Sequence, residues 1–147
     1  RWGGCFGSVW GGTAPKTAVR RAAGLLSDEV MRVEEYTRTK DPDILASGDG
    51  TRHRNLFFEQ TQRMESVANA VDQARTAAAT LMGEDRPYDA APWFWSNQYD
   101  VRLQMVGLSH AHDERVVRGK PEDAAFAVFY LRQGHLIAVD AVNLPMA

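Results

Sequence analysis

Two short segments of the sequence combine residue types that could bind a ligand. The first is residues 39–49 (TKDPDILASGD), in which the apolar run Ile44-Leu45-Ala46 leads to Gly48 and Asp49. The run predicts a short buried strand, and a carboxylate that follows such a strand lies where open α/β sheets bind their ligands. Asp49 could therefore accept hydrogen bonds from the hydroxyl groups of a sugar or polyol. The alternative is an ordinary turn, in which Asp is a common residue.

The second segment is residues 92–98 (PWFWSNQ), which contains Trp93, Phe94 and Trp95. On a strand, residues at i and i+2 point to the same face, so the two tryptophans would form a flat surface suited to stacking on a planar ring. The alternative is that these aromatic residues belong to the hydrophobic core, and for Phe94 we favour the core.

Other residues with reactive side chains lack the partners that chemistry would need. His110, His112 and Asp113 are expected in a solvated turn, because two histidines at i and i+2 in a loop give too few fixed donors for zinc. Cys5 has no partner for an internal disulfide and no local histidine to activate it. Asp140 interrupts an apolar strand and is expected at a sheet edge or in a capped turn. We therefore predict no metal site and assign no catalytic residue.

The clearest predicted element between these segments is a helix over about residues 61–82. Its apolar residues recur at intervals of three and four, which predicts one apolar face. They are Met64, Val67, Ala68, Val71, Ala74, Ala78 and Leu81, and Gly83 is placed to end the helix. Upstream, the alanine-rich stretch 18–26 predicts a shorter helix with Gly24 as its stop, and residues 31–36 predict a short strand.

The polar segment 84–87 (EDRP) predicts a break between two structural units, 1–86 and 87–147. Beyond it the apolar period changes to two, and the predicted elements form a small antiparallel sheet. They are strands at 101–105, 115–118, 126–131 and 136–142, with Gly134 in a hairpin turn between the last two. At the other end, the glycine-rich residues 1–12 predict a poorly defined stretch.

The composition fits a globular protein and excludes several functional classes. Of the 147 residues, 44% are hydrophobic and 24% are charged, and the net charge of −2 gives no electrostatic case for binding nucleic acid. The longest apolar run, residues 124–131, is far shorter than the ~18 residues of a membrane helix. With no secretory leader in the sequence, we expect a cytoplasmic protein with neither nucleic acid nor membrane as partner.

In order and spacing, four segments resemble motifs of the FAD-dependent ferredoxin reductases, the family of the putidaredoxin and rubredoxin reductases. Residues 39–49 resemble its T-x-x-P-x-I-[YFL]-A-x-G-D motif, with Leu45 where Tyr or Phe is commoner. Residues 63–74 (RMESVANAVDQA) resemble its R-x-E-S-V-x-N-A-x-D-Q-A helix, residues 92–100 its P-W-F-W-S-[DN]-Q-Y-D motif, and residues 132–143 its last hairpin. The resemblance covers about residues 13–145.

The resemblance implies an α+β fold, with a remnant of an FAD/NAD(P)-binding α/β domain followed by a small antiparallel-sheet reductase C-terminal domain. It also implies a function. In this family NAD(P)H reduces FAD, and the electrons then pass singly to a ferredoxin-type iron–sulfur protein.

Site residues follow from the same resemblance. It implies that Gly48 and Asp49 lie at the ribityl chain of FAD, with Asp49 accepting its hydrogen bonds, and that Glu65, Ser66 and Val67 face the pyrimidine end of the isoalloxazine ring. Trp93 and Trp95 would lie near the flavin and nicotinamide, on the side where the iron–sulfur partner docks. The positive end of a helix at residues 65–67 would also stabilise an anionic reduced flavin.

The sequence departs from the family at both ends. It contains neither of the family's G-x-G-x-x-G fingerprints, which would hold the pyrophosphates of FAD and NAD, it begins at Arg1, and it stops at Ala147 soon after Asn143-Leu144-Pro145. We therefore expect a C-terminal piece, truncated in its closing domain, that alone is inactive and binds FAD weakly. An alternative is a non-enzymatic α+β module that binds a partner or dimerises through Trp93-Phe94-Trp95. Uncovered apolar residues on the 61–82 helix would favour self-association in either case.

Overall fold

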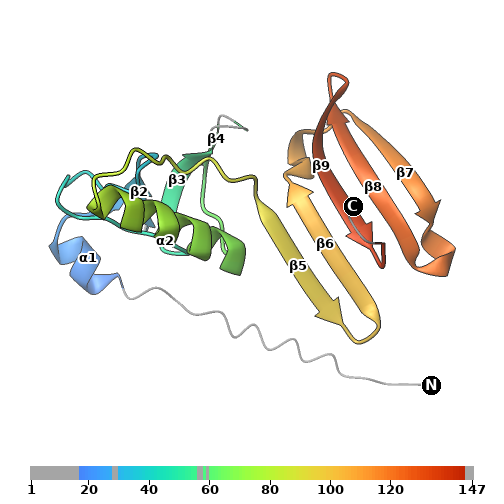
Figure 1. Ribbon diagram of the computed structural model, residues 1–147, viewed down its shortest axis with the longest axis horizontal. Helices are drawn as coiled ribbons and strands as arrows, with labels where there is room; N and C mark the ends of the chain where they lie inside the picture. The colour runs from blue at the N-terminus through green and yellow to red at the C-terminus, as the bar shows by residue number, and fades with distance from the viewer. Residues whose placement is uncertain (1–16, 28–29, 56–57, 59, 145–147) are drawn as a thin grey trace.

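The computed structural model describes residues 17–27, 30–55, 58 and 60–144, which form two parts joined by the extended segment 84–92 (Figure 1). Cys5 and the glycine-rich residues 1–12 lie outside the described residues. Among those described, no helix is both long enough and apolar enough to cross a membrane.

The first part is a small mixed sheet with one long helix packed across it (Figure 1). The sheet has the order β1-β2-β3-β4, in which only β2 and β3 are parallel. Its strands are β1 (Leu26–Ser27), β2 (Val30–Val33), β3 (Thr51–Asn55) and β4 (Gln60–Gln62), and its helices are α1 (Ala18–Ala22) and α2 (Val67–Leu81). Gly24, at φ +67°, ends α1 as predicted.

The second part is a five-stranded antiparallel sheet with the order β5-β6-β9-β8-β7, so the antiparallel sheet predicted from the sequence is confirmed. Its strands are β5 (Trp93–Gln98), β6 (Val101–Gly107), β7 (Glu114–Lys120), β8 (Ala125–Arg132) and β9 (His135–Val142), with 3₁₀ turns η1 (Ser109–Ala111) and η2 (Pro121–Asp123). Gln133 and Gly134 have φ values of +51° and +75°, the pair of positive values that a two-residue hairpin turn requires.

The core between α2 and its sheet is unusually polar. The buried residues of α2 are Asn69, Gln73, Thr76 and Ala79. Facing them, β3 buries Thr51 and His53, which are 0% and 2% exposed. The apolar positions that predicted the helix lie on its other side, where Val67 is 66% exposed and Leu81 is 77% exposed. The expected apolar face is therefore present and uncovered.

The predicted start of this helix, at residue 61, is wrong. Residues 60–62 form β4, which pairs with β3, and the helix begins only after Ser66, whose Oγ accepts a hydrogen bond from the Asn69 N–H at 3.1 Å. Met64 falls before the helix. Apolar spacing does not detect the pairing of β4 with β3, because neither strand contains an apolar residue. The N-cap serine, in contrast, marks the start of the helix locally.

The predicted buried strand at Ile44-Leu45-Ala46 is also wrong. Leu45 makes only a single bridge with Arg38, and Ile44 is 37% exposed. The chain reverses tightly here because Thr39 and Asp41 bond within the turn, where the Asp41 carboxylate accepts from the Asp43 N–H at 3.1 Å. The strand predicted over 31–36 likewise ends at Val33, since the following residues turn the chain.

Asp140 does not lie at a sheet edge or in a turn, as the sequence suggested. It belongs to β9, which is hydrogen-bonded to β6 on one side and β8 on the other. Its carboxylate accepts a hydrogen bond from the Tyr130 hydroxyl at 2.9 Å, a partner that sits on the neighbouring strand and is invisible to local sequence reasoning.

Candidate functional site

The Gly48–Asp49 turn presents an exposed carboxylate on a tightly held backbone. Gly48 is buried with φ +80°, a conformation that favours glycine, and its carbonyl oxygen accepts a hydrogen bond from Thr51 Oγ1 at 2.8 Å. Asp49 is exposed, and within the described residues its carboxylate has no hydrogen-bond or ion-pair partner. The turn therefore leaves both carboxylate oxygens of Asp49 free to accept hydrogen bonds from a ligand.

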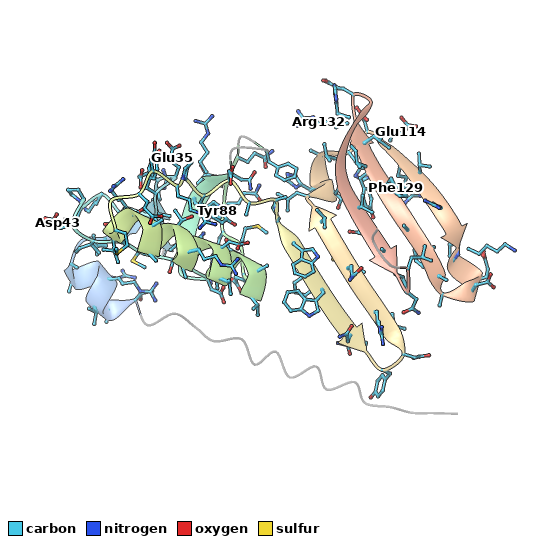
Figure 2. All side chains as sticks on the ribbon, in the orientation of Figure 1. Glu35, Asp43, Tyr88, Glu114, Phe129 and Arg132 are labelled. Carbon is cyan, nitrogen blue, oxygen red and sulfur yellow. The ribbon has the colours of Figure 1, made fainter. Side chains whose placement is uncertain are left out.

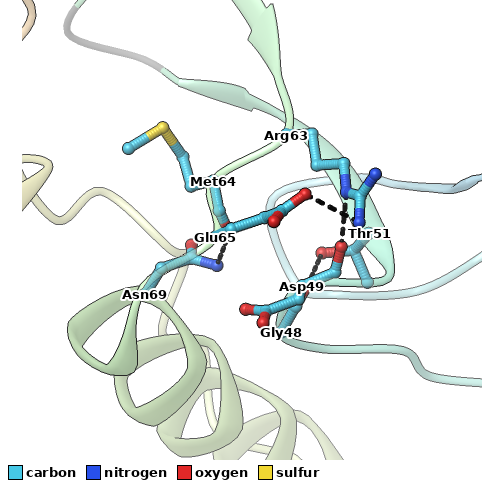
Figure 3. Close-up of polar contacts among 7 residues, drawn as sticks. All are labelled: Gly48, Asp49, Thr51, Arg63, Met64, Glu65 and Asn69. Carbon is cyan, nitrogen blue, oxygen red and sulfur yellow. Dashed lines mark hydrogen bonds and ion pairs between the residues drawn. The ribbon is translucent and has the colours of Figure 1, made fainter. Parts of the chain in front are cut away.

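The N-terminus of α2 lies beside this turn (Figure 3). Ser66 caps it with an extended backbone, and the serine satisfies the amide groups of Asn69 and Ala70. The amide groups of Val67 and Ala68 precede the first residue that an intrahelical carbonyl can reach, so they point out of the helix end. This end carries about half a positive charge, which favours a negatively charged or electron-rich group placed against it.

Arg63 joins the turn to the start of the helix (Figure 3). Its Nε donates to the carbonyl oxygen of Asp49 at 2.7 Å, and its Nη2 pairs with the Glu65 carboxylate at 2.7 Å. The Glu65 side chain is 59% exposed, so the ion pair contributes little to stability and acts mainly as a geometric link.

The tryptophans of β5 form the flat surface that their spacing predicted. The rings of Trp93 and Trp95 stack with centroids 4.9 Å apart and an interplanar angle of 29°. They are 43% and 39% exposed. Phe94, which we expected in the core, is 45% exposed, because β5 is an edge strand of the five-stranded sheet.

One cavity of about 360 Å³ brings the two parts of the chain together. Its wall combines the residues before and at the start of α2 with the adjoining ends of β5 and β6. The lining residues are Met64, Glu65, Ser66, Pro92, Trp93, Phe94, Met105, Gly107 and Leu108. Cavities of this size and mainly apolar lining are typical of small-molecule sites.

The cavity gathers some of the predicted site residues and leaves others beside it. Glu65, Ser66 and Trp93 line it directly. Val67 is the first residue of α2, after Ser66, and Trp95 stacks on Trp93. Gly48 and Asp49 do not line the cavity. Arg63 connects the Asp49 turn to it, because Arg63 bonds both to Asp49 and to the lining residue Glu65.

The chain's similarity to known proteins agrees with this arrangement. Residues 93–147 match the family described as "Reductase C-terminal". The chain is 54% identical over 133 residues to the 5,5'-dehydrodivanillate O-demethylase ferredoxin reductase subunit of Sphingobium sp., covering 90% of this chain and 32% of that protein. It is 44% identical over 135 residues to the putidaredoxin reductase CamA of Pseudomonas putida, covering 92% and 32%.

Two solved structures extend the similarity to the backbone. The putidaredoxin reductase of the covalent putidaredoxin reductase–putidaredoxin complex matches with a TM-score of 0.84 and 44% identity, covering 91% of this chain and 32% of that one. The ferredoxin reductase for the CYP199A2 system of Rhodopseudomonas palustris matches with a TM-score of 0.83 and 42% identity, covering 90% and 33%.

The chain is similar in sequence and in backbone to ferredoxin reductases. The resemblance read from its four motifs is confirmed, as is the α+β fold with a closing reductase C-terminal domain. It spans about a third of the length of the relatives it matches.

The two histidines of the predicted turn, His110 and His112, contact different residues. The His110 ring bonds to the Gln60 side chain at 3.0 Å, which links η1 to β4. His112 Nδ1 lies 2.6 Å from the Ser109 carbonyl oxygen, and its ring packs edge-on against Tyr130. Each ring therefore has a structural contact of its own.

Sequence reasoning missed a group of polar residues buried beneath the site. Asn69 and Gln73, four residues apart on α2, contact His53 on β3 and Tyr88 on the connecting segment, which is labelled in Figure 2. Burial lowers the pKa of His53 and raises the pKa of Tyr88 to about 12, so both side chains are neutral at pH 7. An Asn and a Gln at i and i+4, opposite the apolar stripe of the helix, were the signal that could have revealed them.

Proposed function

We propose that this chain is the C-terminal part of a flavoprotein reductase that passes electrons from NAD(P)H through FAD to a ferredoxin-type iron–sulfur protein. The observation that carries the proposal is one cavity walled by the N-terminus of α2 and by Trp93, with the Asp49 turn tied to it through Arg63. Residues 1–86 would be the edge of the FAD-binding domain and residues 87–147 the closing domain.

The residues around the cavity fit the flavin end of FAD. The apolar side chains of Trp93, Phe94 and Met105 suit a planar aromatic ring, and the cavity is large enough to take one. Next to Ser66, which lines the other wall, the amide groups of Val67 and Ala68 at the start of α2 offer donors and positive potential for the carbonyl oxygens of the pyrimidine ring. The exposed Asp49 carboxylate is suited to accept hydrogen bonds from the ribityl hydroxyl groups.

Bound FAD would supply the exchange between two-electron transfer with a nicotinamide and single-electron transfer with an iron–sulfur centre. The residues of this chain would bind and orient it. The end of α2 would favour negative charge at the pyrimidine end, and the stacked Trp93 and Trp95 would shield one side of the site from water.

The proposed protein partner follows from a relative. Putidaredoxin reductase is known in a covalent complex with putidaredoxin, and the part of it that matches this chain is 44% identical. We place a ferredoxin-type partner on the side of the Trp93-Phe94-Trp95 surface, where an aromatic patch lies exposed next to the cavity.

FAD titration followed by amide and indole NMR tests the proposed cofactor site on the chain itself. We expect weak binding, with signals shifting at Gly48, Asp49, Ser66, Val67 and the indole groups of Trp93 and Trp95. ADP, which has the adenine and phosphates but no flavin, is the matched control ligand. Equal shifts with ADP, or flavin shifts confined to other surfaces, would contradict the proposal.

The strength of binding is a second readout. The chain has no G-x-G-x-x-G segment to hold the pyrophosphate, so little FAD should survive desalting. A stoichiometric yellow complex after desalting would contradict this expectation.

A non-enzymatic module is a second candidate function, favoured by the exposure of Trp93, Phe94 and Trp95 at 43%, 45% and 39%. Such a module would bind a partner or dimerise through this aromatic surface. It predicts that Trp95→Ala changes the oligomeric state and that FAD causes no shifts at Asp49, which separates it from the flavin proposal.

A further inference from the structure

Gln73 lies at the centre of the buried polar group, and both the oxygen and the nitrogen of its side-chain amide have hydrogen-bond partners there. The side chain is 0% exposed. Its Oε1 accepts from the Gly48 N–H at 2.7 Å and lies 2.9 Å from Thr51 Oγ1, whose single hydroxyl proton is shared between Gln73 Oε1 and the Gly48 carbonyl oxygen. A backbone N–H can only donate, so the amide oxygen must face Gly48 and the amide nitrogen must face the other way.

The orientation of Gln73 in turn fixes the proton on His53. Gln73 Nε2 lies 2.9 Å from His53 Nδ1 and donates to Asn69 Oδ1 at 3.1 Å. Because the amide nitrogen donates, Nδ1 must accept, and the proton of the neutral ring must sit on Nε2. His53 Nε2 is buried and has no hydrogen-bond partner within the described part of the chain. The ring is therefore held from one side, by Gln73, with Tyr88 edge-on at 4.7 Å.

Asn69 carries the same network to the start of α2. Its Nδ2 donates to the carbonyl oxygen of Met64 at 2.7 Å, and its Oδ1 accepts from Gln73 and from the Tyr88 hydroxyl, the latter at 3.0 Å. Its backbone N–H is the group that Ser66 caps. An unbroken path of hydrogen bonds therefore runs from Gly48 through Gln73 and Asn69 to Met64.

We propose that Asn69 and Gln73 are positioning residues that set the Asp49 turn at a fixed distance from the N-terminus of α2. The proposal rests on the proposed function, in which these two segments contact the same FAD. Both residues lie on one face of α2, at i and i+4. Asn69 bonds to Met64 before the helix, and Gln73 bonds to Gly48 in the turn, so the rigid helix sets the spacing between these two segments.

The surface link between the same segments does not replace this buried path. Arg63 bonds to Asp49 and Glu65, but its own side chain is 31% exposed and that of Glu65 is 59% exposed, so water competes for both contacts. Apolar residues of similar size at positions 69 and 73 would fill the same space but would not specify where Gly48 lies. The buried amides of Asn69 and Gln73 therefore contribute more to the position of the turn than to the stability of the chain.

Amide hydrogen exchange and ¹⁵N NMR of the histidine rings test the proposal on the chain. In Gln73→Leu the buried Gly48 N–H loses its acceptor, and its exchange should accelerate about tenfold or more, the factor expected for a lost buried hydrogen bond. Thr76→Val is the matched control, because Thr76 is also buried on this face, at 3% exposed, three residues from Gln73. Gly48 exchange in that variant should stay near that of the wild type.

Gln73→Glu decides the question even if the leucine variant fails to fold. The carboxylate still accepts from Gly48, so the amide should remain protected. It has no N–H for His53 Nδ1, so the ring should take a proton on Nδ1, and its ¹⁵N signals should change from the Nε2–H tautomer of the wild type to a form protonated at Nδ1. A wild-type ring protonated on Nδ1, or ring signals unchanged in Gln73→Glu, would overturn the proposal.

A third readout separates this proposal from the proposed function. If FAD shifts Asp49 in the wild type, Gln73→Leu should reduce that shift more than the shift at Trp93, and equal reductions would count against positioning. If FAD shifts neither segment in the wild type, the cofactor proposal fails while the exchange and tautomer results still decide whether Gln73 and Asn69 fix the turn.

Discussion

Arg63 donates from its Nε to the backbone carbonyl oxygen of Asp49 at 2.7 Å, while its Nη2 holds the Glu65 carboxylate at the same distance. A single side chain thus touches both the turn and the segment before α2. The bond from Arg63 uses only the main-chain carbonyl oxygen of Asp49, so the Asp49 carboxylate stays free to accept hydrogen bonds. That arrangement is suited to a ligand with hydroxyl groups.

The first prediction concerns this link. Arg63→Gln removes the ion pair but leaves the buried path through Gln73 intact, so the melting temperature should change by only a few degrees, as expected for a loss of ~1 kcal/mol or less. The FAD-induced NMR shift at Asp49 should weaken. Arg75→Gln, which removes another exposed ion pair, with Asp72, is the stability control. A loss of stability well above that control would mean that Arg63 has a larger structural role.

The second prediction concerns Gly107, where β6 meets the cavity. Its φ is +82°, and a Cβ there would collide with the backbone carbonyl oxygen of Ile137. Gly107→Ala should therefore destabilise the chain by ~3 kcal/mol or more, measured by urea unfolding, because backbone strain and steric overlap add. Gly134→Ala is the matched control. It has a similar φ of +75° but open space around the added carbon, and should cost ~1 kcal/mol. Equal costs for the two variants would show that the collision is relieved cheaply.

Much of the second part could be predicted from the sequence because its signals are local. The antiparallel sheet could be predicted from two local signals: the alternation of Val101, Leu103 and Met105 with polar residues, and the glycine-containing turn at 132–135. Trp93 and Trp95 share a face for the same geometric reason. The family motifs also placed Glu65-Ser66-Val67 at a helix start, which the apolar period alone placed too early.

The first part was harder to predict because its core is polar. The spacing of apolar residues marked the exposed side of α2, while the side that packs on β3 carries Asn69 and Gln73. The β3 sequence TRHRN contains no apolar residue, so no pattern indicated a buried strand. Burial here depends on hydrogen bonds between residues up to 25 positions apart in the sequence, which local periodicity does not encode.

The third prediction concerns pH. Burial lowers the pKa of His53 below the ~6.5 of an unfolded chain. As the pH falls below ~6.5, the unfolded state takes up a proton that the native state resists, so the free energy of unfolding should fall, with a slope approaching ~1.4 kcal/mol per pH unit from this group. Urea unfolding between pH 7.5 and 5.5 measures it. His53→Asn should flatten the slope, whereas His135→Asn, at an exposed position, should not.

The fourth prediction concerns the uncovered side of α2, where Val71 is 43% exposed and Leu81 is 77% exposed. Apolar residues in a row on one helix face favour association, so the chain should form dimers or larger species in size-exclusion chromatography with light scattering. Val71→Lys combined with Leu81→Lys should shift the population toward monomer, because burying two cations against a second apolar surface is costly. Val116→Lys is the control, since Val116 is 47% exposed but lies on β7 in the other part of the chain. If that control dissociates the chain as effectively, the interface lies on the five-stranded sheet. If the wild type is monomeric, the exposed side of α2 does not drive association.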